Sequence, residues 1–377
     1  MEKFAFIIHP MDLKRDASRK YPILRYLPLP VVEKIAMAIS PKIMSHITGI
    51  ESITGAQAEG WLIGCPLSPE MLVDKSREEI VYDKIADAGR LAASLGAKIV
   101  GLGAFTSVAG DAGQSVAKRL EGVINVTSGN SYTVYTGIEG LMRAAELLDI
   151  DVAHARAAVI GATGSIGAVC AKILANKVAD VALVGRDTHK LEALRNEIAA
   201  APGTRPRAST WVATDVHSAL RDADLILTVS SSQDAIIFPE DLKSGAVVCD
   251  VARPRDVSRQ VAEKRKDVLV IEGGVIAVPG NVNFNFDFGF PAHTAYACMS
   301  ETMLMALEGT YESYTLGREL TVERVERIGE IARKHGFKLE KFRSFEKAVD
   351  DAAIEAVREA VRHRQSPPVP TEQVAVA

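Results

Sequence analysis

The chain has 377 residues, which is enough for two domains of ordinary size. Its composition is 47% hydrophobic and 24% charged, so it can bury a sizeable core, and neither a disordered chain nor a collagen-like repeat is expected. The formal net charge of −4 leaves no overall positive field to hold a polyanion, which excludes nucleic acid as an expected partner.

The amino-terminal segment predicts a cytoplasmic location. Met1-Glu2-Lys3 is followed by an apolar run of only residues 4–8, which is too short for a signal-peptide core or a membrane-spanning helix. The four cysteines lie far apart and form no Cys-x-x-Cys pair, so we expect neither a zinc site nor a disulfide framework.

The first 150 residues alternate short apolar runs with helical periods, which predicts a separate α/β domain over residues 1–150. We assign substrate binding to this domain. Strands are expected at 4–8, 61–63, 99–102 and 123–126, and helices at 31–39 and 79–95.

A basic cluster lies near the start of this domain. Its five cations are Lys14, Arg15, Arg19, Lys20 and Arg25, and the apolar residues Tyr21, Ile23, Leu24 and Tyr26 lie beside and among them. Two interpretations remain open: a solvated helix with its apolar residues in the core, or a docking face for an acidic carrier protein or a peripheral membrane contact.

Residues 151–290 show the pattern of a parallel sheet with crossover helices. Strands are expected at 156–160, 181–184, 210–213, 225–230, 246–251 and 268–272. This predicts a doubly wound Rossmann domain, so that the whole chain belongs to the α/β class.

A glycine loop follows the first of these strands and opens a helix. It reads Gly161-Ala162-Thr163-Gly164-Ser165-Ile166-Gly167. Glycines at this spacing allow a tight turn, a close approach of the backbone to a pyrophosphate, and close packing of helix on strand. Gly161, Gly164 and Gly167, with Thr163, Ser165 and Ile166, are therefore candidate dinucleotide-binding residues.

The end of the next strand favours NADPH over NADH. The sequence there is Val184-Gly185-Arg186-Asp187, with Lys190 three residues further on. Arg186 and Lys190 can pair with a ribose 2′-phosphate, whereas Asp187 could face a ribose hydroxyl instead. Alternatively, the two cations are ordinary solvated residues at a helix start.

The carboxyl-terminal part, 291–364, predicts helices that pack back on the first domain. An irregular stretch rich in Gly, Pro and Asn ends near Pro291, and helical periods follow at 292–307, 322–335 and 345–363. The tail 365–377 is expected to be disordered.

Among possible nucleophiles, Cys298 has the best position. Cys170 and Cys249 fall inside a predicted helix and strand and are expected in the core, while Cys65 could be either core or reactive. A thiolate needs a helix N-terminus or a cationic neighbour. If the helix starts at residue 292, Cys298 lies too far inside it for a strong dipole effect, and His293 is not on the same face.

Several ordered motifs together suggest a family. They include Gly103-Ala104-Phe105-Thr106-Ser107, Thr127-Ser128-Gly129-Asn130, the glycine loop, Glu272-Gly273-Gly274 and Ala297-Cys298. In this set the chain resembles the long-chain acyl-[acyl-carrier-protein] reductases of cyanobacteria, which use NADPH to convert a fatty acyl thioester to an aldehyde. The resemblance covers nearly the whole chain up to about residue 340.

The resemblance implies that Cys298 accepts the acyl group from an acyl carrier protein or coenzyme A thioester and that NADPH then delivers a hydride. Thr106, Ser107, Ser128, Asn130 and His293 become candidate contacts for the substrate or its carbonyl oxygen, although the hydroxyl and amide groups could equally cap turns. An aldehyde-consuming enzyme is a further implied partner.

Other functions stay open at this point. A semialdehyde dehydrogenase shares a catalytic cysteine and a similar loop, but its loop normally lies near the N-terminus. An amino-acid or shikimate-type dehydrogenase has the same domain order and needs no thiol. A non-catalytic NADP-binding sensor would use Cys298 only for packing.

Overall fold

The computed structural model describes residues 1–107, 111–201, 208–287, 289–317 and 319–365. The chain divides into two compact units. Unit 1 comprises Met1–Ile138 and Gly273–Glu340, and unit 2 comprises Glu139–Glu272 and Lys341–Ala377. The boundaries set from sequence at 150, 290 and 364 therefore differ from these, and the prediction of a disordered tail concerns residues outside the described part.

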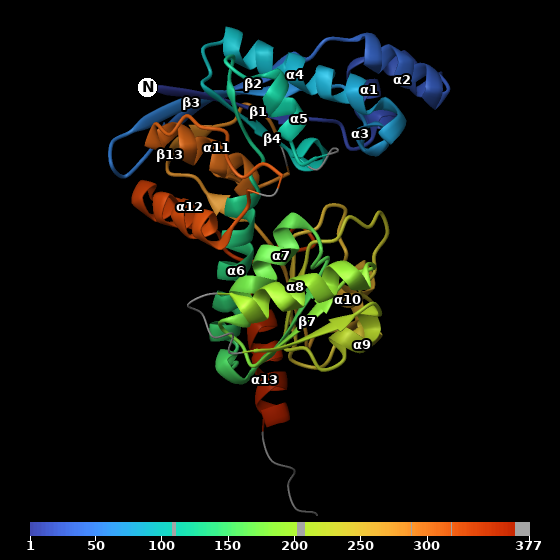
Figure 1. The fold of residues 1–377 in the computed structure, drawn as a ribbon, viewed down its shortest axis with the longest axis vertical. Coiled ribbons are helices and arrows are strands. Elements are labelled where there is room, and N and C mark those ends of the chain that lie inside the picture. Colours follow the sequence, from blue (N-terminus) through green and yellow to red (C-terminus); the bar gives the residue numbers. More distant parts are fainter. Residues whose placement is uncertain (108–110, 202–207, 288, 318, 366–377) are drawn as a thin grey trace, which may run out of the picture. The chain divides into compact units, whose positions relative to one another are not determined.

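Unit 1 is built on a six-stranded mixed sheet (Figure 1). In spatial order its strands are β13 (Gly280–Asn283), β2 (Lys42–Glu51), β3 (Gln57–Gly64), β1 (Glu2–Ile8), β4 (Ile99–Leu102) and β5 (Asn125–Thr127). Strands β3, β1, β4 and β5 are parallel, whereas β2 and β13 are antiparallel to their neighbours. The carboxyl ends of β4 and β5 therefore meet at one edge of the sheet.

Helices cover this sheet on two faces, because successive residues of its central strands point in opposite directions. Ala5 and Ile7 of β1 pack in one core cluster with residues of α4 (Glu78–Ser94), and Phe4 and Phe6 pack in another with residues of α11 (Ala297–Glu308). The remaining helical segments of unit 1 are α1 (Leu13–Lys20), η1 (Pro22–Tyr26), α2 (Leu29–Ala38), α3 (Pro69–Val73), η2 (Lys75–Arg77), η3 (Ala104–Ser107), α5 (Gln114–Arg119) and α12 (Val322–His335).

A small antiparallel sheet completes unit 1. Its strands are β14 (Thr294–Tyr296), β12 (Val275–Ala277) and β15 (Lys338–Leu339). Helix α6 (Asn130–Leu147) begins in unit 1 and ends in unit 2.

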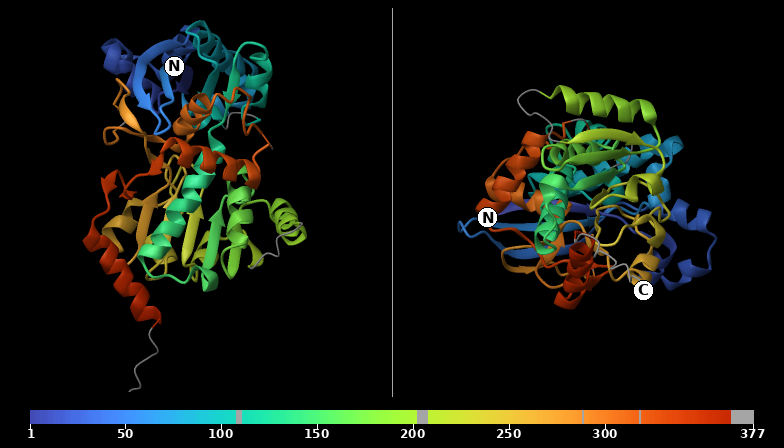
Figure 2. Two further views of the ribbon diagram at one scale, coloured as in Figure 1. Left: turned by 90° about the vertical axis from the view of Figure 1, so that its left-hand side faces the viewer. Right: turned by 90° about the horizontal axis from the view of Figure 1, so that it is seen from below.

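Unit 2 contains a six-stranded sheet in which every pairing is parallel, and its strands lie side by side in Figure 2 (left). Its order is β11-β10-β9-β6-β7-β8. The bounds are β6 (Arg156–Ile160), β7 (Asp180–Val184), β8 (Ser209–Ala213), β9 (Leu225–Thr228), β10 (Val247–Asp250) and β11 (Leu269–Glu272). Counted along the chain this is the order 3-2-1-4-5-6 of a Rossmann fold, which confirms the predicted α/β class and all six predicted strands.

Short helices and a hairpin surround this sheet. They are η4 (Val152–His154), α7 (Ser165–Ala175), α8 (Thr188–Ala200), α9 (Val216–Leu220), η5 (Pro239–Asp241), α10 (Arg259–Lys264), β16 (Arg343–Ser344), β17 (Lys347–Ala348) and α13 (Asp351–Gln365). Within the described ranges, no helix combines the length and the apolar character that crossing a membrane requires.

Two predicted helix starts were wrong. The helix expected from 292 begins only at Ala297, because Thr294–Tyr296 pairs with β12 as a strand. The helix expected from 345 begins at Asp351, because Phe345 and Glu346 have φ of 48° and 71° and form the turn of the β16–β17 hairpin. The helices α11 and α12 lie in unit 1, as expected for elements packing on the first domain, but α13 belongs to unit 2.

Candidate functional site

The glycine loop of unit 2 makes a tight turn directly after β6. The N–H groups of Gly161 and Ala162 both donate to the Val184 carbonyl at the end of β7, at 3.0 Å. Gly161 has φ of +81°, and a Cβ atom there would lie 2.9 Å from the Val229 carbonyl oxygen, just after β9. The loop is therefore held at the carboxyl ends of three strands, at the point where the strand order reverses.

The end of this loop leaves room for an anion. A Cβ atom on Gly167 would lie 2.2 Å from the Gly161 carbonyl oxygen, so α7 can approach the turn only with glycine here. Gly164 caps α7 without a side-chain hydrogen bond, and Thr163, Gly164 and Ser165 are exposed. Since the first N–H groups of a helix have no intrahelical partner, this cradle fits a dinucleotide pyrophosphate, with half-buried Ile166 beside it.

The charged residues after β7 differ in whether they already have a hydrogen-bond or ion-pair partner. The Asp187 carboxylate caps α8 by accepting from the Lys190 N–H at 3.1 Å, and this hydrogen bond keeps the pKa of Asp187 below its usual value. Lys190 Nζ lies 3.6 Å from the same carboxylate. The exposed Arg186 guanidinium has no hydrogen-bond or ion-pair partner in the described part of the chain. Of the two cations predicted here, Lys190 is thus near a carboxylate, whereas Arg186 has no such neighbour among the described residues.

Asp256, which was not predicted as a functional residue, shapes the neighbouring loop. This fully buried carboxylate accepts hydrogen bonds from the Thr228 hydroxyl and from the Ser230 N–H and hydroxyl, the last two at 3.0 and 2.5 Å. It thereby fixes the segment after β9, which faces Gly161. Asp256 is separated from Ser230 by 26 residues, so only the fold brings them together.

A second buried carboxyl lies at the end of β10. Asp250 is 1% exposed and accepts from the N–H groups of Ala252 and Val257, each at 3.1 Å. Burial is the largest influence and raises the pKa of Asp250 to about 6, although the nearby Arg253 charge opposes this.

The four cysteines differ in burial. Cys65, Cys170 and Cys249 are at most 1% exposed, and burial raises the pKa of Cys65 and of Cys249 to about 12. The pKa of Cys170 is raised for the same reason. Such thiols pack as small apolar side chains. Cys298 alone among the four is half-buried.

Cys298 occupies the first turn of α11. Because Thr294–Tyr296 is extended, Tyr296 is the N-cap and Cys298 is the second helical residue. The expectation of a weak dipole effect was therefore wrong, since it assumed a helix start near residue 292. The partial positive charge of a helix N-terminus favours a thiolate over a thiol at this position.

The loop after β5 packs directly on Cys298. Gly129 has φ of +74°, and a Cβ atom there would lie only 2.4 Å from the Cys298 Cβ atom and 2.5 Å from its Cα atom. Only glycine allows this approach. The loop Thr127–Asn130 and the start of α11, which are more than 160 residues apart in the sequence, thus form one site within unit 1.

Glu301 holds this arrangement together and was not predicted from the sequence. It lies one turn beyond Cys298 and is fully buried. Its carboxyl group accepts hydrogen bonds from the Thr127 hydroxyl, the Ser131 hydroxyl at 2.5 Å, the Tyr132 N–H at 2.8 Å and the Thr315 hydroxyl at 3.3 Å. Burial raises the pKa of Glu301, and the hydrogen bonds oppose the shift.

The predicted contact residues have unequal surroundings. Thr106 donates its hydroxyl to the Gly103 carbonyl at 2.8 Å, and Ser128 donates to the Thr315 carbonyl at 2.7 Å, so both hydroxyls already serve local structure. Ser107 is buried and has a partner of its own. Asn130 is 5% exposed, and its carboxamide has no hydrogen-bond partner among the described residues.

His293 is exposed and precedes β14, with φ of 62°. At about 3.3 Å per residue, β14 puts on the order of 10 Å of extended chain between His293 and the start of α11. Its position in the fold gives it no contact with Cys298 that would activate the thiol.

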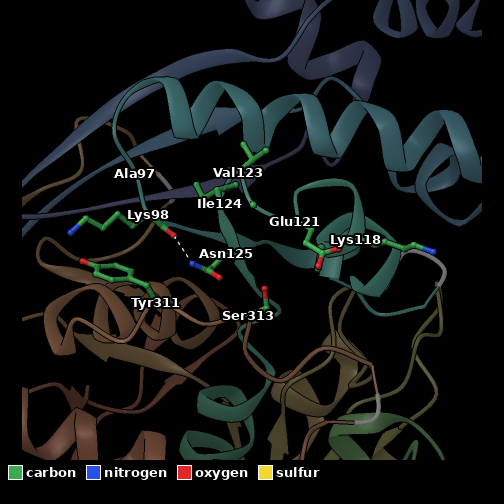
Figure 3. Close-up of a pocket in the computed structure, with 11 residues that line it drawn as sticks. Ala97, Lys98, Lys118, Glu121, Val123, Ile124, Asn125, Tyr311 and Ser313 are labelled. Carbon is green, nitrogen blue, oxygen red and sulfur yellow. Dashed lines mark hydrogen bonds between the residues drawn. The ribbon is translucent and has the colours of Figure 1, made fainter.

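A cavity of about 640 Å³ lies elsewhere in unit 1 (Figure 3). Lys98, Ile124, Asn125, Tyr311 and Ser313 are among its lining residues. It opens at the amino ends of β4 and β5, whereas the loops around Cys298 follow the carboxyl ends of these strands. The cavity is therefore separate from the cysteine site.

Comparison with known proteins agrees with the cofactor site. Residues 143–272 match the family described as shikimate / quinate 5-dehydrogenase. This segment includes all six strands of the parallel sheet of unit 2 and the glycine loop. Unit 2 is an NADP-binding Rossmann domain. The matched part is about a third of the chain, so it says nothing of unit 1.

Three curated relatives extend the similarity. The chain is 31% identical over 320 residues to aminotransferase PigE of Serratia sp. (strain ATCC 39006), which covers 83% of this chain but only 36% of that protein. It is 29% identical over 350 residues to the long-chain acyl-[acyl-carrier-protein] reductase of Synechococcus elongatus, covering 89% of this chain and 98% of the relative. It is 28% identical over 174 residues to glutamyl-tRNA reductase of Sulfurimonas denitrificans, covering 45% and 38%. The chain is thus related to NADP-dependent oxidoreductases.

Proposed function

We propose that the protein reduces a fatty acyl thioester to an aldehyde with NADPH, through an acyl group carried on Cys298. The observation that carries this proposal is the placement of Cys298, the half-buried cysteine, at the N-terminus of α11 against the glycine loop Thr127–Asn130. Similarity over nearly the full length of an acyl-[acyl-carrier-protein] reductase supports the substrate class.

In the first half-reaction the Cys298 thiolate attacks the thioester carbonyl carbon. The carbon–sulfur bond to the carrier breaks, the carrier leaves as its thiolate, and a new thioester forms on Cys298. In the second half-reaction NADPH, when bound by unit 2, would supply a hydride to the same carbonyl carbon and be left as NADP⁺. The oxyanion of the thiohemiacetal on Cys298 then collapses to aldehyde, the carbon–sulfur bond breaks, and Cys298 regains its thiolate.

The residues of unit 1 have distinct tasks in this scheme. The N-terminus of α11 stabilises the thiolate of Cys298 before each turnover. The Asn130 carboxamide has an N–H to donate to the carbonyl oxygen as charge develops there. Thr106, Ser107 and Ser128 act by shaping the loops after β4 and β5, since their positions favour structural hydrogen bonds.

The cofactor residues complete the scheme in unit 2. Gly161, Gly164 and Gly167, with Thr163, Ser165 and Ile166, hold the pyrophosphate of NADPH, and Arg186 with Lys190 meets its 2′-phosphate.

The relatives named above include a reductase of an acyl group on a carrier protein and one of an acyl group on tRNA. A carrier-bound acyl group is therefore the shared chemistry, and we place an acyl carrier protein or coenzyme A thioester in this role, with an aldehyde-consuming enzyme downstream.

The test measures aldehyde formation from a panel of long-chain acyl thioesters with NADPH. Cys298→Ala abolishes aldehyde formation and leaves NADPH affinity unchanged, whereas Cys65→Ala, a buried control, retains turnover. Turnover by the Cys298→Ala variant at the wild-type rate would defeat the mechanism.

A second function is favoured by one observation. The family match over residues 143–272 is to a dehydrogenase, and a shikimate-type or amino-acid dehydrogenase transfers hydride without a thiol. Such an enzyme would oxidise its substrate with NADP⁺ at a rate that iodoacetamide does not change. NADPH binding without turnover on any substrate of either class would instead indicate a sensor.

A further inference from the structure

The strongest unassigned feature is an exposed apolar surface near the N-terminus. Seven of the 17 exposed large hydrophobic side chains in the described part of the chain fall between residues 11 and 35. Ile23 and Tyr26 are the most exposed of these, at 70% and 71%. Such a concentration of exposed apolar side chains in one short segment indicates a binding role.

Buried side chains of the same segment hold this exposed surface in place. Leu13, Leu24, Val32 and Ala36 are buried and anchor α1, η1 and α2 on unit 1. Pro22 is the first residue of η1, and prolines stand at the N-cap and in the first turn of α2, which restricts the backbone at both starts. Figures 1 and 2 show α1 and α2 at the outer edge of unit 1. We call the exposed residues Tyr21, Ile23, Tyr26, Leu29, Val31 and Ile35 the apolar face.

Positive charge surrounds the apolar face. Residues 11–35 contain six cationic and three anionic side chains, giving a formal charge of +3 in a chain whose total is −4. The side chains of Arg19 and Lys20 lie outside the described part. Arg25 and Lys34 are exposed and have no acidic partner among the described residues.

Two of the three anionic groups in this segment are already in ion pairs. Asp16 lies 3.3 Å from Arg15, and Glu33 lies 3.2 Å from Arg77 of the next segment. The Arg25 guanidinium stacks over the Tyr26 ring at 4.7 Å, so a cation accompanies the most exposed aromatic side chain. Aliphatic tips, tyrosines and unpaired cations in one exposed group match the layered chemistry of a bilayer surface.

We propose that the apolar face binds the surface of an anionic lipid bilayer. A second copy of the chain fits poorly, because a two-fold contact would bring each positive surface against itself. An acidic protein partner would pair with the cations but would need a hollow shaped for tips as exposed as Ile23, whereas a fluid bilayer needs none. Anionic lipid satisfies both the charge and the apolar tips, and this binding does not depend on the reaction proposed above.

The test is co-sedimentation of the full chain with vesicles of phosphatidylcholine, alone or with about a quarter phosphatidylglycerol. We expect the chain to bind the anionic vesicles at least about tenfold more strongly than the neutral ones. We expect this binding to fall severalfold in 0.5 M salt, because the electrostatic screening length is then about three times shorter than in dilute buffer. Ile23→Ser with Tyr26→Ser lowers vesicle binding by about tenfold or more.

The matched control is Ile53→Ser with Val123→Ser, which removes exposed apolar side chains of unit 1 outside the apolar face, at 74% and 49% exposure. The control binds vesicles as the parent does. Equal binding by the two double variants would overturn the proposal, as would equal binding to neutral vesicles. Self-association lost in the Ile23→Ser and Tyr26→Ser variant, without vesicle binding by the parent, would assign the face to a second copy instead.

Discussion

Replacing Gly129 with alanine tests whether the loop after β5 positions Cys298. The added Cβ atom would lie 2.4 Å from the Cys298 Cβ atom and 2.9 Å from the Cys298 carbonyl oxygen, where ordinary contacts begin at 3.4 Å. The loop and the first turn of α11 must therefore separate by about 1 Å, and a misplacement of this size in a reacting group costs on the order of 10²-fold in rate.

Gly122→Ala supplies the matched control, because φ is +73° at Gly122 and +74° at Gly129. An alanine in the left-handed backbone conformation at either position lowers the unfolding free energy by about 1–2 kcal/mol. At Gly122, however, no atom lies within 4 Å of the added Cβ atom. We expect both variants to lose unfolding free energy through the backbone conformation, and Gly129→Ala to lose more because of its contact with Cys298.

The assay is the pre-steady-state release of free thiol from an acyl-coenzyme A, which reports acyl transfer to the protein. Gly122→Ala keeps the parent rate within about twofold, and Gly129→Ala loses about 10²-fold. Equal acyl-transfer rates in the two variants would refute the positioning of Cys298 by this loop.

Three other predictions concern unit 2. Arg186→Ala should narrow the preference for NADPH over NADH by about 10- to 100-fold in Kd ratio, whereas equal weakening of both would argue against a 2′-phosphate contact. Gly167→Ala should abolish dinucleotide binding, because its Cβ atom would meet a backbone carbonyl oxygen at 2.2 Å, while Gly185→Ala, with its nearest contact at 3.4 Å, should retain it in the same fluorescence titration. Burial raises the pKa of Asp250 from 3.8 to about 6, so between these two pH values the folded protein keeps a proton that the unfolded chain has released. The unfolding free energy therefore falls by about 3 kcal/mol as pH rises from 3.8 to about 6. Asp250→Asn should remove that slope in urea denaturation, and identical slopes in variant and parent would contradict it.

The Rossmann sheet was predictable because most of its strands are built on a short apolar run. Residues 157–160, for example, are buried on both faces, and the glycine loop follows at once. By contrast, β2 was missed because Ser45, His46 and Gly49 interrupt its apolar pattern. It becomes a strand by pairing between β3 and β13, and β13 lies more than 200 residues away.

The cysteine site was predictable only in part. The position of Cys298 after the nucleotide domain is visible in the sequence, but its place in the first turn of α11 depends on the pairing of Thr294–Tyr296 with β12. Glu301 could not be predicted as a site residue, because its role depends on hydrogen bonds from the hydroxyl groups of Thr127 and Ser131. These residues lie 174 and 170 positions away in the sequence. From the helical periodicity alone, Glu301 is expected to be an ordinary polar residue on the surface of a helix.

The most direct measurement is mass spectrometry of the protein after mixing with a long-chain acyl thioester in the absence of NADPH. We expect one acyl group, located on the peptide that contains Cys298, and we expect added NADPH to discharge it as aldehyde. An unmodified Cys298 peptide while aldehyde is still formed would contradict the central claim, as would an adduct that NADPH leaves in place.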